Sequence, residues 1–377
     1  MGTFERPNSE SFFDHPITGV LNSILTVAIA MKKVHRNSFL EGRNHEGPRD
    51  LIQNNIHVCV LLNSEAMQAD VPVLVRLWDV FDLIICADGG ANRLYDGLQA
   101  LDPNLISKCV PTFIKGDLDS VRSDVESFYR NSKCRVVRDP DQDTNDLEKC
   151  LQLVQALCQG KQPTGIEDAA ENADGTFSFP QLQNKESSIT VVVFGAFGGR
   201  FDQQIATLHA IYLYADYFQR LVLLGDGNCA TLLHPGTRPP QAQLARQGSL
   251  KASPTAAASA TSAERGTCSP QHTTHTLHLI PGIEGPSCSL LPVGGRCDVV
   301  STTGLKWNLA SQSLALGELI STSNRVMGRA KTAPGASAEG RGDVEGECTV
   351  TVQCSQPVLW CCQVNLNNAC VDSQSCI

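Results

Sequence analysis

Short apolar runs recur along the first part of the chain, beginning near residue 56. The clearest are rich in β-branched side chains and occupy 57–63, 82–88, 111–117, 134–140, 188–195 and 220–226. Strands that are buried on both faces of a sheet have this nearly continuous apolar character. Stretches with helical spacing lie between them, for example at 146–158 and 201–216. The alternation predicts an α/β domain with a doubly wound parallel sheet over residues 51–226.

Beyond about residue 227 the helical spacing stops, and the chain becomes a series of short strand-like runs. These runs occupy 230–236, 274–282, 287–294, 296–304, 312–317 and 348–354, and Gly and Pro interrupt them. Closely spaced strands with turn residues between them are typical of antiparallel sheets. We therefore expect an all-β domain, an antiparallel β-sandwich or barrel, over residues 227–361.

The other segments show little periodic pattern. They are an N-terminal extension (1–50), loop insertions (160–187, 237–273 and 326–346) and an atypical C-terminal tail (362–377). Such segments bury too little apolar surface to offset the entropy of ordering, so we expect a poorly ordered extension and mobile loops. The apolar run at 19–31 is too short to span a bilayer, and the acidic residues before it are unlike a signal peptide. No membrane association is expected.

The composition fits a globular protein of two domains and disfavours some partners. The chain has 377 residues, of which 42% are hydrophobic and 18% are charged. Its net charge of −9 argues against nucleic-acid binding, although a bound divalent metal would allow a polyphosphate substrate. The 16 cysteines are scattered through apolar, strand-like runs, which indicates a reducing compartment, and we expect a cytoplasmic location. They include no C-x-x-C pair, which disfavours a structural zinc site.

The first candidate site is Asp88, Gly89 and Gly90, which follow the apolar run at 82–88. Open α/β sheets bind ligands at the carboxyl ends of their strands. Backbone N–H groups at glycine residues that begin a helix can hold an anion. The alternative is an ordinary strand-to-helix turn in which Asp88 caps the helix.

The second candidate site is the pair Asp117 and Asp119. In an extended segment, residues two apart project to the same side, so the two carboxylates would converge. Mg²⁺ takes oxygen ligands of this kind, usually together with substrate phosphates and water. Alternatively, Asp119 or Ser120 caps a helix that begins at Val121, which leaves Asp117 unexplained.

The third candidate site is the acidic segment 139–150. Within it, Asp143, Asp146 and Lys149 recur along one side of a helix that begins here. Acidic residues in a first helical turn also complement the helix dipole, which is the alternative interpretation. The four aspartates of the segment exceed what capping requires, and they would repel one another unless a cation lay among them.

Two further segments carry candidate binding residues. Gly198, Gly199 and Arg200 allow close backbone approach and offer a planar guanidinium for a phosphate. Their G-x-x-G-G spacing does not fit the dinucleotide fingerprint, which disfavours a nicotinamide cofactor. Trp307 lies in a polar segment, where its ring suits a flat cationic ligand. The alternative for Trp307 is a partly buried packing residue.

Taken together, these segments resemble the thiamine pyrophosphokinase family, in particular its animal type. The matching stretches are CADGGANRLYD (86–96), GDLDS (116–120), DPDQD (139–143), GGRFDQ (198–203), TTGLKWNL (302–309) and STSN (321–324), in this order. The resemblance implies a Rossmann-like domain followed by a β-sandwich, in a homodimer that binds thiamine where two subunits meet. It also implies transfer of a diphosphate from ATP to the thiamine hydroxyl, giving thiamine diphosphate and AMP.

Carried over by position, the resemblance also implies roles for individual residues. It assigns Mg²⁺ to Asp117, Asp119 and Asp146, and makes these residues and Arg200 catalytic. For ATP it implies Asp88, Gly89, Gly90, Asp143, Gly199, Arg200 and Asp202, and for thiamine it implies Trp307, Ser321 and Asn324. Two alternatives stay open: a catalytically weak isoform that binds thiamine or nucleotide, and a nucleotide-dependent oxidoreductase on the same α/β fold.

Overall fold

The computed structural model describes residues 32–42, 55–162, 179–235, 273–328 and 348–369. These ranges belong to one compact unit, Met31–Ile377. The apolar run at 19–31, most of the three predicted insertions and the last eight residues, 370–377, lie outside the described residues.

A ten-stranded sheet forms the framework, and its first half is the predicted parallel sheet. The parallel strands are β7 (Arg220–Gly225), β6 (Ile189–Phe194), β2 (Ile56–Leu61), β3 (Leu83–Ala87), β4 (Phe113–Gly116) and β5 (Arg135–Arg138), in this spatial order. The chain runs outward from β2 to β5 and then returns to add β6 and β7 on the other side of β2. The direction of strand addition therefore reverses between β2 and β6, and parallel sheets bind ligands in a crevice at such a switch point.

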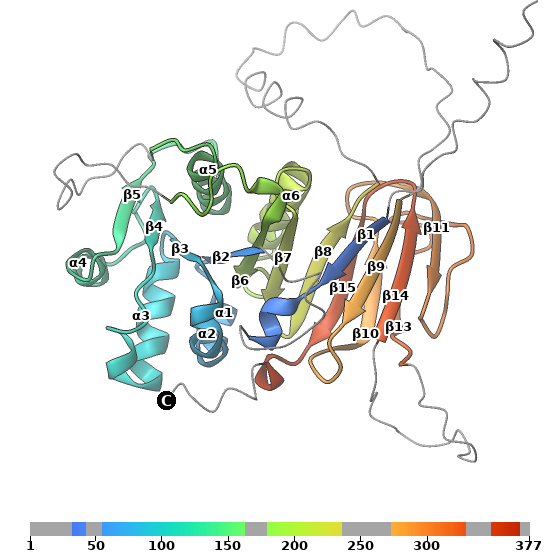
Figure 1. Cartoon of the computed structure of the whole chain (residues 1–377), viewed down its shortest axis with the longest axis horizontal. Coiled ribbons are helices and arrows are strands. Elements are labelled where there is room, and N and C mark those ends of the chain that lie inside the picture. Colours follow the sequence, from blue (N-terminus) through green and yellow to red (C-terminus); the bar gives the residue numbers. More distant parts are fainter. Residues whose placement is uncertain (1–31, 43–54, 163–178, 236–272, 329–347, 370–377) are drawn as a thin grey trace, which may run out of the picture. The chain divides into compact units, whose positions relative to one another are not determined.

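Helices cover both faces of the parallel strands (Figure 1). They are α1 (Glu65–Ala69), α2 (Val71–Leu77), α3 (Gly90–Leu101), α4 (Ser123–Asn131), α5 (Asp146–Cys158) and α6 (Phe201–Tyr214). The first four share a core cluster with alternate strand residues such as Cys59 and Leu61, whereas α5 and α6 pack on Val58 and Val60. Short 3-10 helices are η2 (Ser38–Glu41), η4 (Trp78–Val80), η5 (Pro103–Leu105), η6 (Glu186–Ser188) and η8 (Leu366–Asn368). Within the described ranges, no helix is long and apolar enough to cross a bilayer.

The predicted domain boundary near residue 226 does not interrupt the ten-stranded sheet. Asp226 and Gly227 both have positive φ, 48° and 68°, and turn β7 directly back into the antiparallel strand β8 (Asn228–Leu233). Asp-Gly is the preferred pair for this two-residue hairpin turn. The sheet then continues through β15 (Val358–Val364), β10 (Glu284–Leu291) and β13 (Ser321–Arg325).

A second sheet of five strands completes the predicted β-rich part. Its spatial order is β1 (Lys32–Arg36), β9 (Thr273–Leu279), β14 (Cys348–Cys354), β11 (Cys297–Thr303) and β12 (Gln312–Leu314). Buried residues from both sheets, such as Cys288 of β10 and Val350 of β14, share one core cluster. The two-part fold expected from the sequence is therefore present.

Two terminal segments differ from the expectation. Part of the predicted disordered extension forms β1, which pairs in parallel with β9, and the adjoining Phe39 and Leu40 are buried. At the other end, β15 continues beyond the expected boundary at 361, and Leu366 is buried after it. Both segments gain order through long-range strand pairing, which a local pattern of residues does not reveal.

A pair of buried histidines joins β1 to β9. The Nε2 atom of His35 lies 3.0 Å from Nδ1 of His275, and the ring centroids are 5.2 Å apart. The remaining ring nitrogens are buried without a hydrogen-bond partner among the described residues. Burial, together with the charges of nearby Lys33 and His234, lowers the pKa of His275 to about 3. Burial, Arg220 and His275 likewise lower the pKa of His35, so both rings are neutral at pH 7.

We expect this pair to make the fold sensitive to acid. Between the ordinary histidine pKa of 6.5 and the folded value of about 3, the unfolded chain binds more protons, so the unfolding free energy falls with falling pH. The variant His35→Leu/His275→Leu should therefore lose less thermal stability than the wild type between pH 7.5 and pH 5, as measured by calorimetry. His209→Gln, at an exposed site, serves as the control and should keep the wild-type slope. Equal slopes in all three proteins would contradict the role of the pair.

Candidate active site

Three aspartates converge at the carboxyl edge of the parallel strands. Asp88 follows β3, Asp117 follows the neighbouring β4, and Asp146 begins α5. One carboxylate oxygen from each lies within 4.8 Å of the others. Since the carboxyl ends of adjacent parallel strands meet at one edge, residues far apart in the sequence come together here.

Asp88 reaches this position through an unusual backbone conformation. Its φ of 43° lies in the left-handed region, which aspartate tolerates better than most residues. Its N–H donates to the carbonyl of Lys115 at 2.9 Å, and its carbonyl accepts from Ala91 N–H at 3.0 Å. A Cβ atom at Gly116 would lie 2.6 Å from the Asp88 Cβ, so glycine is required opposite it. Asp88 does not cap α3 with its side chain.

Lys149 is the positive partner of the three carboxylates. Its side chain is 2% exposed, and its Nζ lies 3.4 Å from Asp146 Oδ1 and 3.9 Å from Asp117 Oδ2. Gln142 Nε2 also donates to Asp117 Oδ2 at 2.8 Å, which lowers the pKa of Asp117. Three carboxylates and one ammonium leave a net charge of −2 when all four groups are ionised.

The negative charge of the three carboxylates is only partly compensated by Lys149. Burial raises the pKa of Asp88 to about 6, and the neighbouring Asp146 and Asp117 raise it as well. Burial also raises the pKa of Asp146 in spite of Lys149. Asp88 is only 2% exposed, and its Oδ1 has no hydrogen-bond partner among the residues that the structure describes. Converging oxygen ligands, a net charge of −2 and an unpartnered oxygen fit a hard divalent cation such as Mg²⁺.

Asp119 lies outside this group of three. The expectation that Asp117 and Asp119 project to the same side assumed an extended segment, but Leu118 between them has a φ of 65°. Asp119 is consequently exposed, and its Oδ1 accepts from Ser120 Oγ at 2.9 Å. The capping alternative also fails, because α4 begins at Ser123 after Arg122, without a side-chain cap.

Asp143 also lies apart from the group, in the exposed turn before α5. Its N–H donates to Asp141 Oδ1 at 3.1 Å. Asn145 caps α5, since its Oδ1 accepts from Glu148 N–H at 2.9 Å. Asp146 is therefore not needed as a cap, and its position beside Asp88 and Asp117 requires another explanation.

The glycine-rich segment after β6 lies at the switch between β2 and β6. Arg200 precedes α6, and its Nη2 lies 2.5 Å from Asp202 Oδ2, with side chains 73% and 64% exposed. Gly199 has a φ of 69° and open space around it. Asn63, which follows β2 at the same edge, accepts from Arg93 Nε at 3.0 Å. Our reading of the sequence overlooked Asn63 and Arg93, although Asn63 occupies the same place after its strand as Asp88 does.

Trp307, Ser321 and Asn324 form a separate cluster in the β-rich part. Asn324 is buried, accepts from Trp307 N–H at 3.2 Å and donates from Nδ2 to the Trp307 carbonyl at 2.8 Å. Its Nδ2 also lies 3.4 Å from Ser321 Oγ. The Trp307 side chain is nevertheless 56% exposed, and Lys306 Nζ lies 4.5 Å from its ring centroid. Trp307 is therefore held by its backbone with its ring presented outward, which contradicts the packing alternative.

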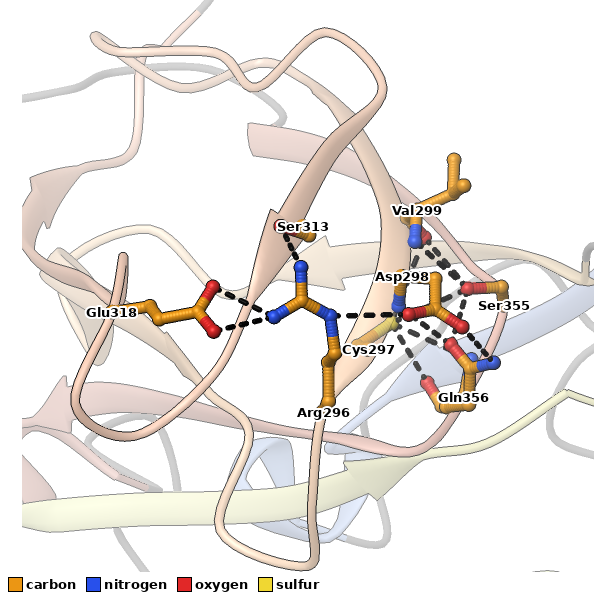
Figure 2. Close-up of polar contacts among 8 residues, drawn as sticks. All are labelled: Arg296, Cys297, Asp298, Val299, Ser313, Glu318, Ser355 and Gln356. Carbon is orange, nitrogen blue, oxygen red and sulfur yellow. Dashed lines mark hydrogen bonds and ion pairs between the residues drawn. The ribbon is translucent and has the colours of Figure 1, made fainter.

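A polar network fixes the loop that leads from β12 to β13. Figure 2 shows Arg296 between Glu318 of this loop, at 2.6 and 2.7 Å, and Asp298 of β11, at 3.2 Å. Arg296 Nη2 also donates to Ser313 Oγ at 3.0 Å. The loop carries the exposed apolar side chains Leu316, Leu319 and Ile320.

Two family models match the chain over the parts that contain these clusters. Residues 74–223 match the model described as "Thiamin pyrophosphokinase, catalytic domain", and residues 274–332 match "Thiamin pyrophosphokinase, vitamin B1 binding domain". "Thiamine pyrophosphokinase 3" of Oryza sativa subsp. japonica is 34% identical over 257 residues, which cover 67% of this chain and 73% of the rice protein. The chain belongs to the thiamine pyrophosphokinase family.

Other members of the thiamine pyrophosphokinase family agree with this assignment. "Thiamine pyrophosphokinase 1" of Arabidopsis thaliana is 29% identical over 299 residues, covering 78% of this chain and 86% of the plant protein. The crystal structure of yeast thiamin pyrophosphokinase superimposes with a TM-score of 0.60 and 21% identity, over 91% of this chain and 94% of the yeast chain. This likeness supports the fold described above. The family expected from the sequence is confirmed, whereas the animal type is not tested by these relatives.

Gly116→Ala tests whether this thiamine pyrophosphokinase homologue uses Asp88 as part of a metal site. The new methyl group would displace the Asp88 side chain from the group of three. We expect Mn²⁺, titrated as a spectroscopic substitute for Mg²⁺, to bind at least about tenfold more weakly, a loss of about 1.4 kcal/mol. Gly317→Ala is the control, because Gly317 is an exposed glycine of the β-rich part with open space around it, and this variant should bind Mn²⁺ as the wild type does. Unchanged Mn²⁺ binding in a folded Gly116→Ala protein would argue against this site.

Proposed function

We propose that this protein transfers a diphosphate group from ATP to the hydroxyl of thiamine, producing thiamine diphosphate and AMP. The observation that supports the proposal most strongly is the group Asp88, Asp117 and Asp146, in a chain of the thiamine pyrophosphokinase family. Diphosphate transfer requires little covalent work from a protein. It requires two aligned substrates and local compensation of phosphate charge.

The chain's own residues suit these tasks on the ATP side. Asp117, Asp146 and Asp88 would hold Mg²⁺, which when bound neutralises charge on the phosphate oxygens. Lys149 keeps Asp117 and Asp146 in place through its buried ammonium. Arg200 would exchange Asp202 for a phosphate, which its exposed guanidinium can reach without moving a core residue.

The other predicted residues belong to the rim of this site. Gly89 and Gly90 bring the start of α3 against β2, because a Cβ on Gly90 would collide with the Leu61 carbonyl oxygen. The backbone N–H groups there favour an anion. We assign Asp119, Asp143 and Gly199, all exposed at the same edge, to outer contacts with the nucleotide or its hydrated cation.

The thiamine side would be formed around Trp307. Thiamine is cationic and carries two flat rings, and the exposed indole offers a face for stacking and cation–π attraction. Asn324 holds the backbone of Trp307, and Ser321 supports Asn324. The exposed apolar residues Leu316, Leu319 and Ile320 support a homodimer in which this site meets a second subunit.

The remaining parts of the proposal follow from charge and resemblance. We propose a cytoplasmic enzyme of the animal type, since the sequence motifs resemble that type. The net charge of −9 argues against nucleic acid as a partner.

The decisive experiment is to mix the purified chain with ATP, Mg²⁺ and thiamine and to measure AMP and thiamine diphosphate. We expect both products in equal amounts, and only when all three components are present. Thiamine and ATP binding without AMP would identify the catalytically weak isoform instead. Nicotinamide-dependent absorbance changes without AMP would identify the oxidoreductase alternative.

Asp117→Asn and Asp119→Asn should differ in this assay. Asp117 belongs to the group of three carboxylates, so its replacement should lower kcat by about a hundredfold or more. Asp119 is exposed and lies outside the group, so its replacement should cost less than about tenfold. Thermal unfolding of both variants provides the control for folding. Equal losses in the two variants would show that Asp119 contacts the reacting groups directly.

Trp307→Ala should impair thiamine binding selectively. Loss of a cation–π contact costs about 1–2 kcal/mol, which corresponds to a rise of about five- to thirtyfold in KM for thiamine. The KM for ATP and the melting temperature should hardly change, because the ring is 56% exposed. Trp307→Phe is the milder variant, and its KM for thiamine should lie between those of the wild type and Trp307→Ala. A parallel rise in both Michaelis constants together with a lower melting temperature would exclude the thiamine role.

A further inference from the structure

A row of cysteines crosses three neighbouring strands of the ten-stranded sheet. Cys288 of β10 pairs with Cys362 of β15, which in turn pairs with Cys229 of β8. Directly paired residues on adjacent strands point to the same face of a sheet. All three are nearly inaccessible and belong to the core cluster between the two sheets.

A carboxylate is buried beside two of these cysteines. Glu284, at the start of β10, is only 8% exposed. One of its carboxylate oxygens and the sulfur atoms of Cys229 and Cys362 lie within 4.8 Å of one another. Carboxylates are rarely buried in apolar cores without a partner that compensates their charge. The position of Glu284 therefore depends on the polar groups that surround it in the core.

Hydrogen bonds from the surrounding backbone and side chains orient this group. Asn37 Nδ2 donates to Glu284 Oε1 at 2.7 Å and lies 3.4 Å from Cys229 Sγ. The backbone N–H of Ile280 donates to Glu284 Oε2 at 2.9 Å. Arg220 donates in turn to Asn37 Oδ1 at 2.7 Å. Supporting donors that fix ligand atoms from behind are typical of metal sites.

We propose that Cys229, Glu284 and Cys362 form a zinc-binding site inside the β-rich part of the fold. Thiolate sulfur and carboxylate oxygen are both zinc ligands, and soft sulfur selects zinc over magnesium. Zinc with Zn–S near 2.3 Å and Zn–O near 2.1 Å in a tetrahedron separates its ligand atoms by about 3.6–3.8 Å. The spacing of the three atoms allows this with small side-chain adjustments. Water would occupy the fourth position.

The charges of the site stay balanced when zinc binds. Burial raises the pKa of the Glu284 carboxyl group, whereas the charge of Arg220 lowers it. Binding of Zn²⁺ releases one proton from each thiol, so two positive charges enter with the metal and two leave as protons. No uncompensated charge is created in the core, which is the main cost of placing an ion there.

The absence of a C-x-x-C pair in the sequence does not count against such a site. The ligands come from β8, β10 and β15, which are separated by long stretches of chain and meet only through strand pairing. Zinc would therefore connect β8, the strand that follows the parallel strands, to β15, the last strand among the described residues. Its effect should appear as stability of β15 and not as a change in the chemistry at the aspartate cluster.

The test uses the full-length chain, stripped with a chelator and then titrated with Zn²⁺ or Co²⁺. We expect one Zn²⁺ per chain by elemental analysis, a thiolate-to-cobalt absorption band with Co²⁺, and a melting temperature raised by several degrees by Zn²⁺. Cys229→Ser, Cys362→Ser and Glu284→Gln should each weaken Zn²⁺ binding at least tenfold. Excess Mg²⁺ should not displace the cobalt band.

Cys361→Ser is the matched control. Cys361 lies next to Cys362 on β15 but belongs to the opposite face of the sheet, so it should bind Zn²⁺ as the wild type does. Asp117→Asn should also keep the band, which separates this proposal from the proposed enzymatic function. The proposal fails if wild-type protein shows no cobalt–thiolate band, if the band survives in Cys229→Ser and Cys362→Ser, or if mass spectrometry finds these two cysteines joined by a disulfide.

Discussion

The convergence of three carboxylates at one sheet edge is the constraint on which the rest of the site depends. Two like charges about 4 Å apart repel by about 4 kcal/mol near a protein surface, so the fold must compensate for bringing Asp88, Asp117 and Asp146 together. Lys149 supplies part of the compensation from within α5. The rigid parallel strands supply the remainder, because β3 and β4 cannot separate without losing their hydrogen bonds. A site under such repulsion is prepared for a cation.

Within the described part of the chain, the ten-stranded sheet connects the two predicted domains through continuous strand pairing. The Asp226–Gly227 turn joins β7 to β8, and β8 pairs with β15 over six residues. Strand pairing thus runs without a gap from β5 to β13. A disturbance of β15 would reach β7 through one intervening strand, and β6, which leads to Arg200, lies next to β7. Strand β15 is therefore linked to β6 through two intervening hydrogen-bonded strands, β8 and β7.

Local sequence patterns predicted the elements well and their long-range contacts poorly. The helix at 146–158 was predicted with the bounds that α5 has, because its apolar spacing and its first residues are local signals. The membership of Asp88 in the carboxylate group was not predicted, because it depends on the pairing of β3 with β4 and on Gly116 facing it. Asp119 does not project to the same side as Asp117, because Leu118 between them has a positive φ, which the sequence does not reveal. Strand β1 was missed because its partner, β9, lies more than 230 residues along the chain.

The two clusters of candidate metal ligands differ in the atoms that they offer and in their access to solvent. Asp88, Asp117 and Asp146 offer only oxygen, at an edge open to phosphates and water, which suits a cation that keeps part of its hydration shell. The buried ammonium of Lys149 reduces the negative charge of that group, so the cation would bind weakly by itself and more tightly with a polyphosphate. Cys229, Glu284 and Cys362 offer two sulfur atoms and one carboxylate oxygen in a closed interior, where a bound metal would keep at most one water. If both proposals hold, the two parts would bind cations of different kinds, because ligand type and solvent access differ between them.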